Sequence, residues 1–489
     1  MASSLASAAS AGVPDPATVT LALSTRKLPA GSCLDATITV GPDRTGQDVQ
    51  LQRATREGWR TIARIPLGPG SQALVRTCMH WSDLGTVRLR SRWPRQDADN
   101  ETGVSAIKDV KVVKARWMRK IDRLVRKRSI GVSVGAGAVG GDPAAHTFLY
   151  RRADATRRAP ASNEKLLLSM ALLDRLGPDA RFATKAGVTR WRNGVSGDLW
   201  ITGAGDPEVG PGKIRSLATR LVDAGLRRVR GRVLGNRGGF ARDWWARGWK
   251  RSYRDLYIPL PTALTWQGNR AGGRHIRDPE RRAAASLHEQ LRRMGVRIGG
   301  RPGDGRPKRS LDTVAQVGSA PLEDLLRRQN VHSKNFFAEV LGKALGAARA
   351  GAPGTIAKGA RSIEAFTKGL EVRARAYDSS GLSSANRIAP GGIVRLLLAA
   401  EDASWYEPLR TSLPSAGQGT LRGRLRGVGV RAKTGTLSGI SALSGWVWLE
   451  QEDRWATFSI LSRGMSKSTA VAIEDRIVRA ISNGARIPD

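Results

Sequence analysis

The segment 160–178, PASNEKLLLSMALLDRLGP, decides the fold of this chain. Its apolar residues recur with the spacing of one helical face, and a Gly-Pro pair at 177–178 ends the run. The pattern predicts a helix that begins next to Ser162, with Lys165 one turn further along. A serine hydroxyl near the free N–H groups of a helix start, beside a lysine amine, is typical of a nucleophile paired with its base.

The Ser-x-x-Lys spacing alone is weak evidence, because the chain contains it three times. The other copies begin at Ser24 and Ser105, and both lie in β-rich sequence with no helical pattern after them. Only the copy at Ser162 has the helix that would hold the lysine above the serine.

A Ser-x-Asn pattern occurs twice downstream. Ser333 and Asn335 precede the strongly helical run NFFAEVLGKAL, whereas Ser384 and Asn386 lie in the turn-rich stretch DSSGLSSANRIAP. The first copy is the better partner for Ser162, although a serine before a helix is equally explained as an N-cap.

A third pattern, Lys433-Thr434-Gly435, occurs once, just before two β-runs at 441–450 and 454–462. The glycine lets another backbone approach a strand edge, the lysine offers a cation for a carboxylate, and the threonine offers a hydroxyl. The three motifs, in this order, are those of β-lactamases and penicillin-binding proteins.

From about residue 115 onward the chain resembles the D-alanyl-D-alanine carboxypeptidase/endopeptidase family, the class C low-molecular-mass penicillin-binding proteins. The resemblance also rests on GDLWITGAGDP, QNVHSKNFFAEVLGKALG, YDSSGLSSANRIAP and GTLRGRLRG. It implies an α/β (α+β) fold of the penicillin-binding/β-lactamase-like transpeptidase type, with helices flanking an antiparallel sheet. It also implies a serine peptidase that needs no cofactor.

The resemblance assigns roles to residues of this chain. Ser162 would be the acylated nucleophile, Lys165 its base, and Ser333 with Asn335 the second catalytic pair. Asn335 would also hold the amide carbonyl of the substrate, and Lys433 its terminal carboxylate. Thr434, Gly435 and Thr436 would also bind the substrate. The backbone N–H groups of Ser162 and Thr436 would form the oxyanion hole.

The implied reaction is cleavage of peptidoglycan stem peptides that end in D-Ala-D-Ala, or of their cross-links, by a carboxypeptidase or endopeptidase outside the cytoplasm. β-Lactams would acylate the same serine. Two departures concern substrate choice: Ser162 and Ser333 are closer in sequence than is usual for the family, and Asn236 stands where the family commonly has Asp.

The length of 489 residues predicts two to four domains, because one hydrophobic core rarely serves a chain of this size. We expect a lead or signal remnant at 1–16, an immunoglobulin-like β-sandwich at 17–114, a catalytic domain at 115–185 and 312–489, and an inserted domain at 186–311. The basic run 114–128 has the spacing of an amphipathic helix that opens the catalytic domain, or alternatively of a membrane-surface helix.

The net charge of +39 would attract any polyanion. Because the arginines are scattered and no nucleic-acid-binding motif occurs, we expect no nucleic-acid partner. The arginines either form a solvated surface without a partner or bind anionic cell-wall polymers. A non-catalytic basic cell-wall-binding protein is the rival function, and a β-lactamase is a lesser enzyme alternative.

Other sequence signals are weaker. Cys33 and Cys78 are too far apart for a metal or redox motif, so they form either one disulfide or two reduced core thiols. Ala9-Ser10-Ala11 resembles a signal-peptide cleavage site, and no apolar stretch is long enough to span a membrane. The five histidines lack zinc-ligand spacing, so no metal is expected.

Two further glycine motifs compete with this interpretation. Gly131-Val132-Ser133-Val134-Gly135 fits a hydrolase nucleophile elbow, and 135–140 spells a dinucleotide fingerprint. Neither is followed by the helix that its chemistry requires.

Overall fold

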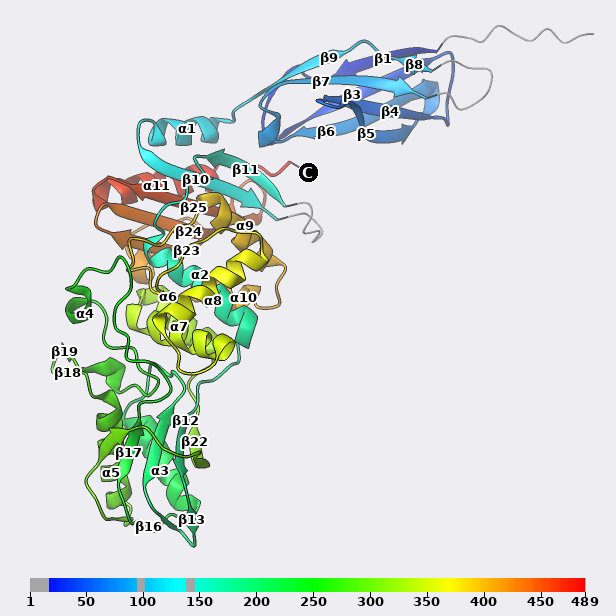
Figure 1. The fold of residues 1–489 in the computed structure, drawn as a ribbon. Coiled ribbons are helices and arrows are strands. Elements are labelled where there is room, and N and C mark those ends of the chain that lie inside the picture. The colour runs from blue at the N-terminus through cyan, green and yellow to red at the C-terminus, as the bar shows by residue number, and fades with distance from the viewer. Residues whose placement is uncertain (1–16, 95–101, 138–145, 489) are drawn as a thin grey trace, which may run out of the picture. The chain divides into compact units, whose positions relative to one another are not determined.

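A computed structural model describes residues 17–94, 102–137 and 146–488 (Figure 1). The chain divides into two compact units, one of residues 1–122 with 484–489 and the other of residues 123–483. The leading segment 1–16, with the cleavage-like Ala9-Ser10-Ala11, lies outside the described residues. No described helix is long and apolar enough to cross a membrane.

The first unit is built from two sheets of alternating strands, which bury one face each. One sheet has the order β1-β3-β6, and the other has the order β2-β9-β7-β4-β5 with β8 paired to β7. The bounds are β1 Thr18–Leu23, β2 Lys27–Pro29, β3 Ser32–Gly41, β4 Asp48–Thr55, β5 Gly58–Pro66, β6 Gln72–Met79, β7 Gly85–Trp93, β8 Gly103–Val104 and β9 Lys108–Val113.

A disulfide joins Cys33 on β3 to Cys78 on β6, which are register partners in that sheet. Of the two uses left open for these cysteines, the structure has the disulfide.

The end of the chain belongs to the first unit, although the sequence placed it with the catalytic region. Ala485 and Ile487 are buried, and the backbone of Arg486 lies against Gly31 in the turn between β2 and β3. In the sequence, only the alternating apolar residues Ala485 and Ile487 mark this segment. Two residues are too short a signal to assign it to a domain.

The second unit contains a five-stranded antiparallel sheet with the order β11-β10-β25-β24-β23. Its strands are β10 Ser129–Ala136, β11 Thr147–Arg152, β23 Val430–Leu437, β24 Ile440–Leu449 and β25 Arg454–Arg463. The Lys433 motif therefore has a strand of its own, β23, at the edge of the sheet. The expected strand pair around 129–152 is also present as β10 and β11.

Helices cover both faces of this sheet (Figure 1). On β24, Ser441 bonds to Glu474 of α11, whereas its neighbour Ala442 joins the core of α2, α6, α7 and α9. Alternating side chains thus face opposite helical layers. The helices are α2 Glu164–Leu176, α6 Leu322–His332, α7 Asn335–Ala350, α8 Ile356–Gly369, α9 Pro390–Glu401, α10 Tyr406–Ser412 and α11 Lys467–Ser482. Another helix, α1 Arg116–Val125, contains the residue at which the first unit passes into the second.

A separate sheet with its own core follows α2 in the chain. Its order is β21-β17-β15-β12-β22, and α3 and α5 pack on it and on each other. The bounds are β12 Thr184–Val188, β15 Leu199–Gly203, α3 Pro211–Asp223, β17 Val233–Asn236, α5 Pro279–Arg293, β21 Gly303–Gly305 and β22 Asp312–Val317. Strands β12 and β22 extend beyond the expected limits 186 and 311, because they pair with each other to complete the sheet.

Small elements complete this region. A four-stranded sheet has the order β13-β14-β16-β20, and β18 pairs with β19. The bounds are β13 Trp191–Arg192, β14 Val195–Ser196, β16 Arg228–Val229, β20 Arg297–Ile298, β18 Arg270–Ala271, β19 Arg274–His275 and α4 Tyr253–Leu256.

Candidate active site

Ser162 lies in a short 3-10 turn, Ala161–Asn163, directly before α2. The helix runs over the predicted residues 164–176. The side chain of Asn163 does not cap it but donates from Nδ2 to Ser444 Oγ on β24 at 2.7 Å. This bond ties the turn to the sheet, while Ser162 itself stays partly exposed.

The Lys165 amine is buried and lies 3.2 Å from Ser162 Oγ. It also donates to Asn335 Oδ1 at 2.8 Å and to the carbonyl of Ser380. Burial lowers the pKa of Lys165 to about 8, against the opposing effect of nearby carboxylates. A neutral amine has two N–H groups, so donation to Asn335 and Ser380 leaves its lone pair for the Ser162 hydroxyl proton.

Three buried carboxyl groups that the motifs did not indicate surround Lys165, on Glu164, Glu339 and Asp378. Burial, followed by the charge of Asp378, raises the pKa of Glu164 well above normal and that of Glu339 to about 8. Glu339 Oε1 accepts the backbone N–H groups of Ser379 (2.9 Å) and Ser380 (2.7 Å). Glu339 therefore holds the backbone N–H of Ser380, the residue whose carbonyl accepts a hydrogen bond from the Lys165 amine.

Asp378 organises the loop that follows α8. It accepts hydrogen bonds from Trp249 Nε1 at 2.6 Å, from Asn386 Nδ2 at 2.7 Å and from backbone N–H groups of its own loop. Asn386 is buried in this network and Ser384 is exposed, so the second Ser-x-Asn copy is structural. The structure brings the first copy to Ser162.

Ser333 ends α6 in the left-handed conformation, with φ +53°, and it is not the N-cap of α7. This position turns its hydroxyl to Lys433, whose Nζ donates to Ser333 Oγ at 3.0 Å and to the carbonyl of Thr434 at 2.9 Å. Lys433 is fully buried. Burial, followed by the charge of Lys165, holds its pKa well below the usual range.

The edge of β23 can accept an extended peptide. Ala432 N–H points away from the sheet and donates to Pro414 O at 3.1 Å. Because alternate N–H groups of a strand point to the same edge, those of Thr434 and Thr436 also face outward. This direction fits the oxyanion-hole role expected of the Thr436 N–H.

Packing inside the protein gives a further reason for a glycine at position 435. A Cβ on this residue would lie 2.7 Å from the carbonyl oxygen of Pro160 and 3.1 Å from the Ala161 side chain. The glycine therefore lets β23 approach the turn that carries Ser162, rather than only admitting a substrate backbone.

A cleft of about 1040 Å³ opens over these groups. Its walls include six of the predicted site residues, namely Ser162, Ser333, Asn335, Thr434, Gly435 and Thr436. Lys165 and Lys433 lie behind this surface. The cleft also has walls that motif reading did not find, which include Tyr253, Tyr257, Leu382, Arg422 and Lys467.

The remaining sequence candidates lie apart from the cleft. Ser24 and Ser105 belong to the first unit, and Ser133 of the elbow-like motif is buried within β10. The fingerprint-like run at 135–140 also begins on β10, and its residues from 138 lie outside the described residues.

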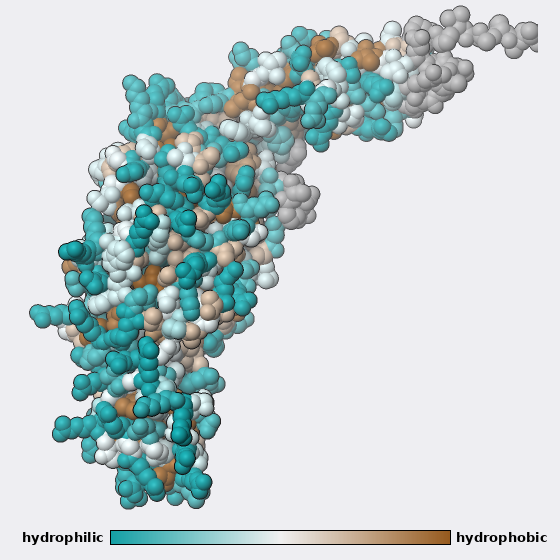
Figure 2. Space-filling model, viewed as in Figure 1, coloured by the Kyte–Doolittle hydropathy of each residue, from teal (hydrophilic) through white to brown (hydrophobic). Residues whose placement is uncertain are grey.

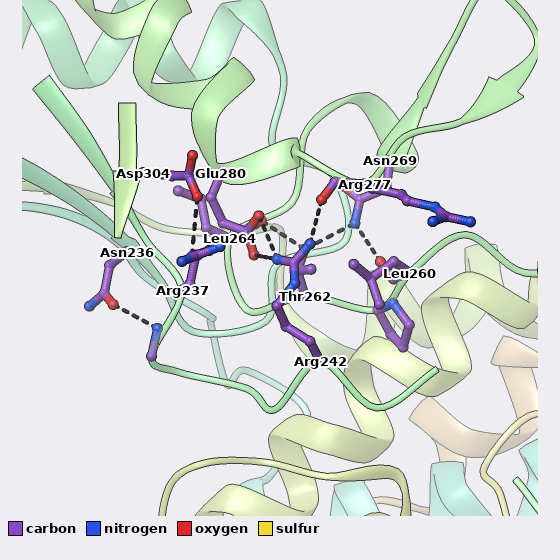
Figure 3. A network of polar contacts seen from close by, with 12 residues as sticks. Asn236, Arg237, Arg242, Leu260, Thr262, Leu264, Asn269, Arg277, Glu280 and Asp304 are labelled. Atoms are coloured by element: carbon purple, nitrogen blue, oxygen red, sulfur yellow. Dashed lines mark hydrogen bonds and ion pairs between the residues drawn. The ribbon is translucent and has the colours of Figure 1, made fainter. Parts of the chain in front are cut away.

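Asn236 ends β17 and bonds within its own region (Figure 3). Its Nδ2 donates to Thr202 Oγ1 at 3.2 Å, and its Oδ1 accepts the N–H of Gly238 at 2.7 Å. The residue does not line the cleft described above.

Comparison with known proteins agrees with this geometry. Residues 118–272 and 267–483 match the model of the D-Ala-D-Ala carboxypeptidase 3 (S13) family. A D-alanyl-D-alanine carboxypeptidase of Actinomadura sp. is 28% identical over 439 residues, covering 70% of this chain and 80% of the relative. Carboxypeptidase DacB of Mycolicibacterium smegmatis is 28% identical over 363 residues, covering 67% and 76%.

The solved structure of penicillin binding protein 4 (dacB) from Haemophilus influenzae has a similar fold. It aligns with a TM-score of 0.63 at 18% identity, over 74% of this chain and 99% of that chain. The expected penicillin-binding/β-lactamase-like fold is thereby confirmed. The chain belongs to the D-Ala-D-Ala carboxypeptidase 3 (S13) family and is an enzyme, a serine-type peptidase of that family.

Proposed function

We propose that this enzyme cleaves peptidoglycan stem peptides after the penultimate D-alanine, as a carboxypeptidase or as an endopeptidase on cross-links, through an acyl-enzyme on Ser162. The observation that carries the proposal is the Ser162–Lys165 pair, 3.2 Å apart, at the wall of the cleft. A buried amine with a pKa lowered to about 8 can accept the serine proton near neutral pH.

In acylation, the Ser162 proton passes to Lys165 Nζ as Oγ attacks the carbonyl carbon of the penultimate residue. The negative charge that forms on the carbonyl oxygen is stabilised by the N–H groups of Ser162 and Thr436. The outward direction of the Thr436 N–H supports this role, and the substrate then lies along the β23 edge as an added strand.

Collapse of this intermediate breaks the C–N bond, and the leaving amine takes up a proton. The proton that Lys165 took from Ser162 reaches this amine through the hydroxyl of Ser333, which lines the same cleft as Ser162 and bonds to Lys433. Hydrolysis repeats the cycle with water as the nucleophile and restores the free serine.

Lys433 acts on the terminal carboxylate from behind the cleft wall. Its buried amine bonds to Ser333 and to Thr434, and a substrate carboxylate beside Thr434 and Thr436 would raise its pKa and make it cationic. A β-lactam has the same carboxylate and acylates Ser162 in place of the peptide.

The substrate class places the enzyme outside the cytoplasm, in the cell wall or periplasm. The Cys33–Cys78 disulfide supports this location, since such bonds persist in oxidising compartments.

Release of D-alanine from a synthetic peptide ending in D-Ala-D-Ala tests the proposal. The enzyme should release one D-alanine per peptide, and Ser162→Ala should abolish release. Ser24→Ala is the matched control, because it alters an exposed Ser-x-x-Lys serine in the first unit and should keep full activity. Release that survives Ser162→Ala would contradict the proposal.

A further inference from the structure

A second site candidate lies in the small four-stranded sheet β13-β14-β16-β20. Its register pairs Arg192 with Val195, Val195 with Arg228, and Arg228 with Arg297. Neighbouring strands are about 4.8 Å apart, and directly paired residues project from the same face. Three arginines therefore form one row across this face, with Arg228 and Arg297 side by side.

A groove continues from this row. Its volume is about 610 Å³, and its charged walls are Arg292, Arg297 and Arg301, with His288 beside them and no acidic residue among its described walls. We call Arg192, Arg228, Arg292, Arg297 and Arg301 the distal arginine cluster. All five are exposed.

Like charges at directly opposed strand positions destabilise a sheet, so it matters whether nearby carboxylates neutralise these arginines. Elsewhere in the same region arginines are neutralised: Arg237 contacts Asp304 at 3.1 Å and Arg242 contacts Glu280 at 2.9 Å (Figure 3). None of the described carboxylates forms an ion pair with the distal arginine cluster.

A titratable group in the groove senses the same positive potential. His288 has a lowered pKa, first because it is partly buried and second because Arg292 is near, with Glu289 opposing. Glu289 itself pairs with Arg293 at 2.9 Å, outside the cluster. The groove thus keeps an uncompensated positive charge.

We propose that the distal arginine cluster binds a phosphodiester polymer of the cell envelope and holds the catalytic unit on it. Successive phosphates are a suitable partner for a row of exposed guanidinium groups, each of which can bond two phosphate oxygens. The groove walls contain no phenylalanine, tyrosine or tryptophan side chain on which a base could stack, which favours a polyol phosphate over a nucleic acid. The choice of an envelope polymer rests on the proposed function.

The cluster is remote from the catalytic edge within the second unit. β13 and β16 lie at an end of that unit far from β23 (Figure 1), where hydrophilic residues predominate on the face shown (Figure 2). A polymer bound there leaves the cleft open to peptides, so binding should not inhibit the enzyme.

Binding of poly(glycerol phosphate) to the full chain, measured by calorimetry over a salt series, tests the proposal. Arg228→Gln/Arg297→Gln/Arg301→Gln should weaken binding about tenfold or more. It should also lower the slope of log K against log salt by about 2, because each phosphate that is no longer neutralised removes roughly 0.7 from that slope. The charge-preserving variant with Lys at all three positions should keep most of the affinity.

The matched control removes three exposed arginines elsewhere in the unit, on or near α8 and α11, by Arg361→Gln/Arg426→Gln/Arg476→Gln. It should change the affinity less than about twofold. Equal weakening by both triple variants would overturn the proposal in favour of diffuse net charge. Tighter binding of single-stranded DNA than of poly(glycerol phosphate) would overturn the assignment of the polymer.

Acylation of Ser162 by a β-lactam in the same samples separates this proposal from the previous one. We expect all variants to be acylated normally, since none of the substituted residues lines the catalytic cleft. Loss of polymer binding with intact acylation would support the site, whereas tight polymer binding by the cluster variant would refute it even in an active enzyme.

Discussion

Replacing Asp378 by Asn should make the enzyme acylate faster at neutral pH, although the residue lies in the catalytic network. The carboxylate of Asp378 is the largest influence opposing the burial that lowers the pKa of Lys165 to about 8. A nearby opposite charge typically changes a pKa by about 1–3 units. Its removal should therefore move the Lys165 pKa further down.

The magnitude follows from the fraction of neutral amine. With a pKa of about 8, roughly a tenth of Lys165 is neutral at pH 7, and a pKa lower by about one unit would make this fraction about a half. The acylation rate at pH 7 should rise about fivefold, while the plateau at high pH should not rise. The direction is contrary to the usual loss of activity on mutating a buried active-site carboxylate.

The assay measures the second-order rate constant for acylation by a chromogenic β-lactam between pH 5.5 and 9.5. The readout is the midpoint, the pH at which this rate constant reaches half of its plateau value. Ser384→Ala is the matched control, because Ser384 lies exposed in the same loop and has no charge, so the midpoint should stay in place. A midpoint that stays in place or rises in Asp378→Asn would refute the reasoning. Loosening of the loop would expose Lys165 to water and raise the midpoint, which is the opposite shift.

Three further changes have defined outcomes. Gly435→Ala should lower the acylation rate and cost about 1–3 kcal/mol of stability by thermal unfolding, because its Cβ would displace the turn carrying the nucleophile; full activity would contradict this packing argument. Ser333→Ala should slow peptide cleavage by about 10²-fold or more, whereas Ser384→Ala should leave it within about twofold; equal effects of the two would contradict the site. Reduction of the Cys33–Cys78 bond should destabilise the first unit by about 2–4 kcal/mol in denaturant unfolding and leave acylation intact; loss of acylation together with that unfolding would show that the catalytic unit depends on it.

The residues that we propose to act in the reaction could be predicted because short local patterns contain them. Ser162 and Lys165 are three positions apart on one helix, and Lys433 is followed directly by the residues of the strand edge. The helical pattern that follows Ser162 then selected this copy from the three Ser-x-x-Lys matches, and the order of the motifs supported the choice. The structure brings the chosen copy to Asn335 and Ser333, as predicted.

The second layer of the site could not be predicted in the same way. Glu339 lies within an apolar helical run, where its charged side chain was the only sign of a buried polar site. Asp378 belongs to a turn-rich stretch. Their electrostatic effect on Lys165 depends on burial set by the packing of distant segments. The role of Gly435 was likewise hidden, because the clash it avoids is with a turn far away in sequence.

The central claim is that Ser162 is the nucleophile, and the mass of the protein after exposure to penicillin tests it most directly. We predict a single adduct per chain, on the peptide that contains Ser162, and no adduct in Ser162→Ala. An adduct on any other residue, or one that persists in Ser162→Ala, would contradict the account.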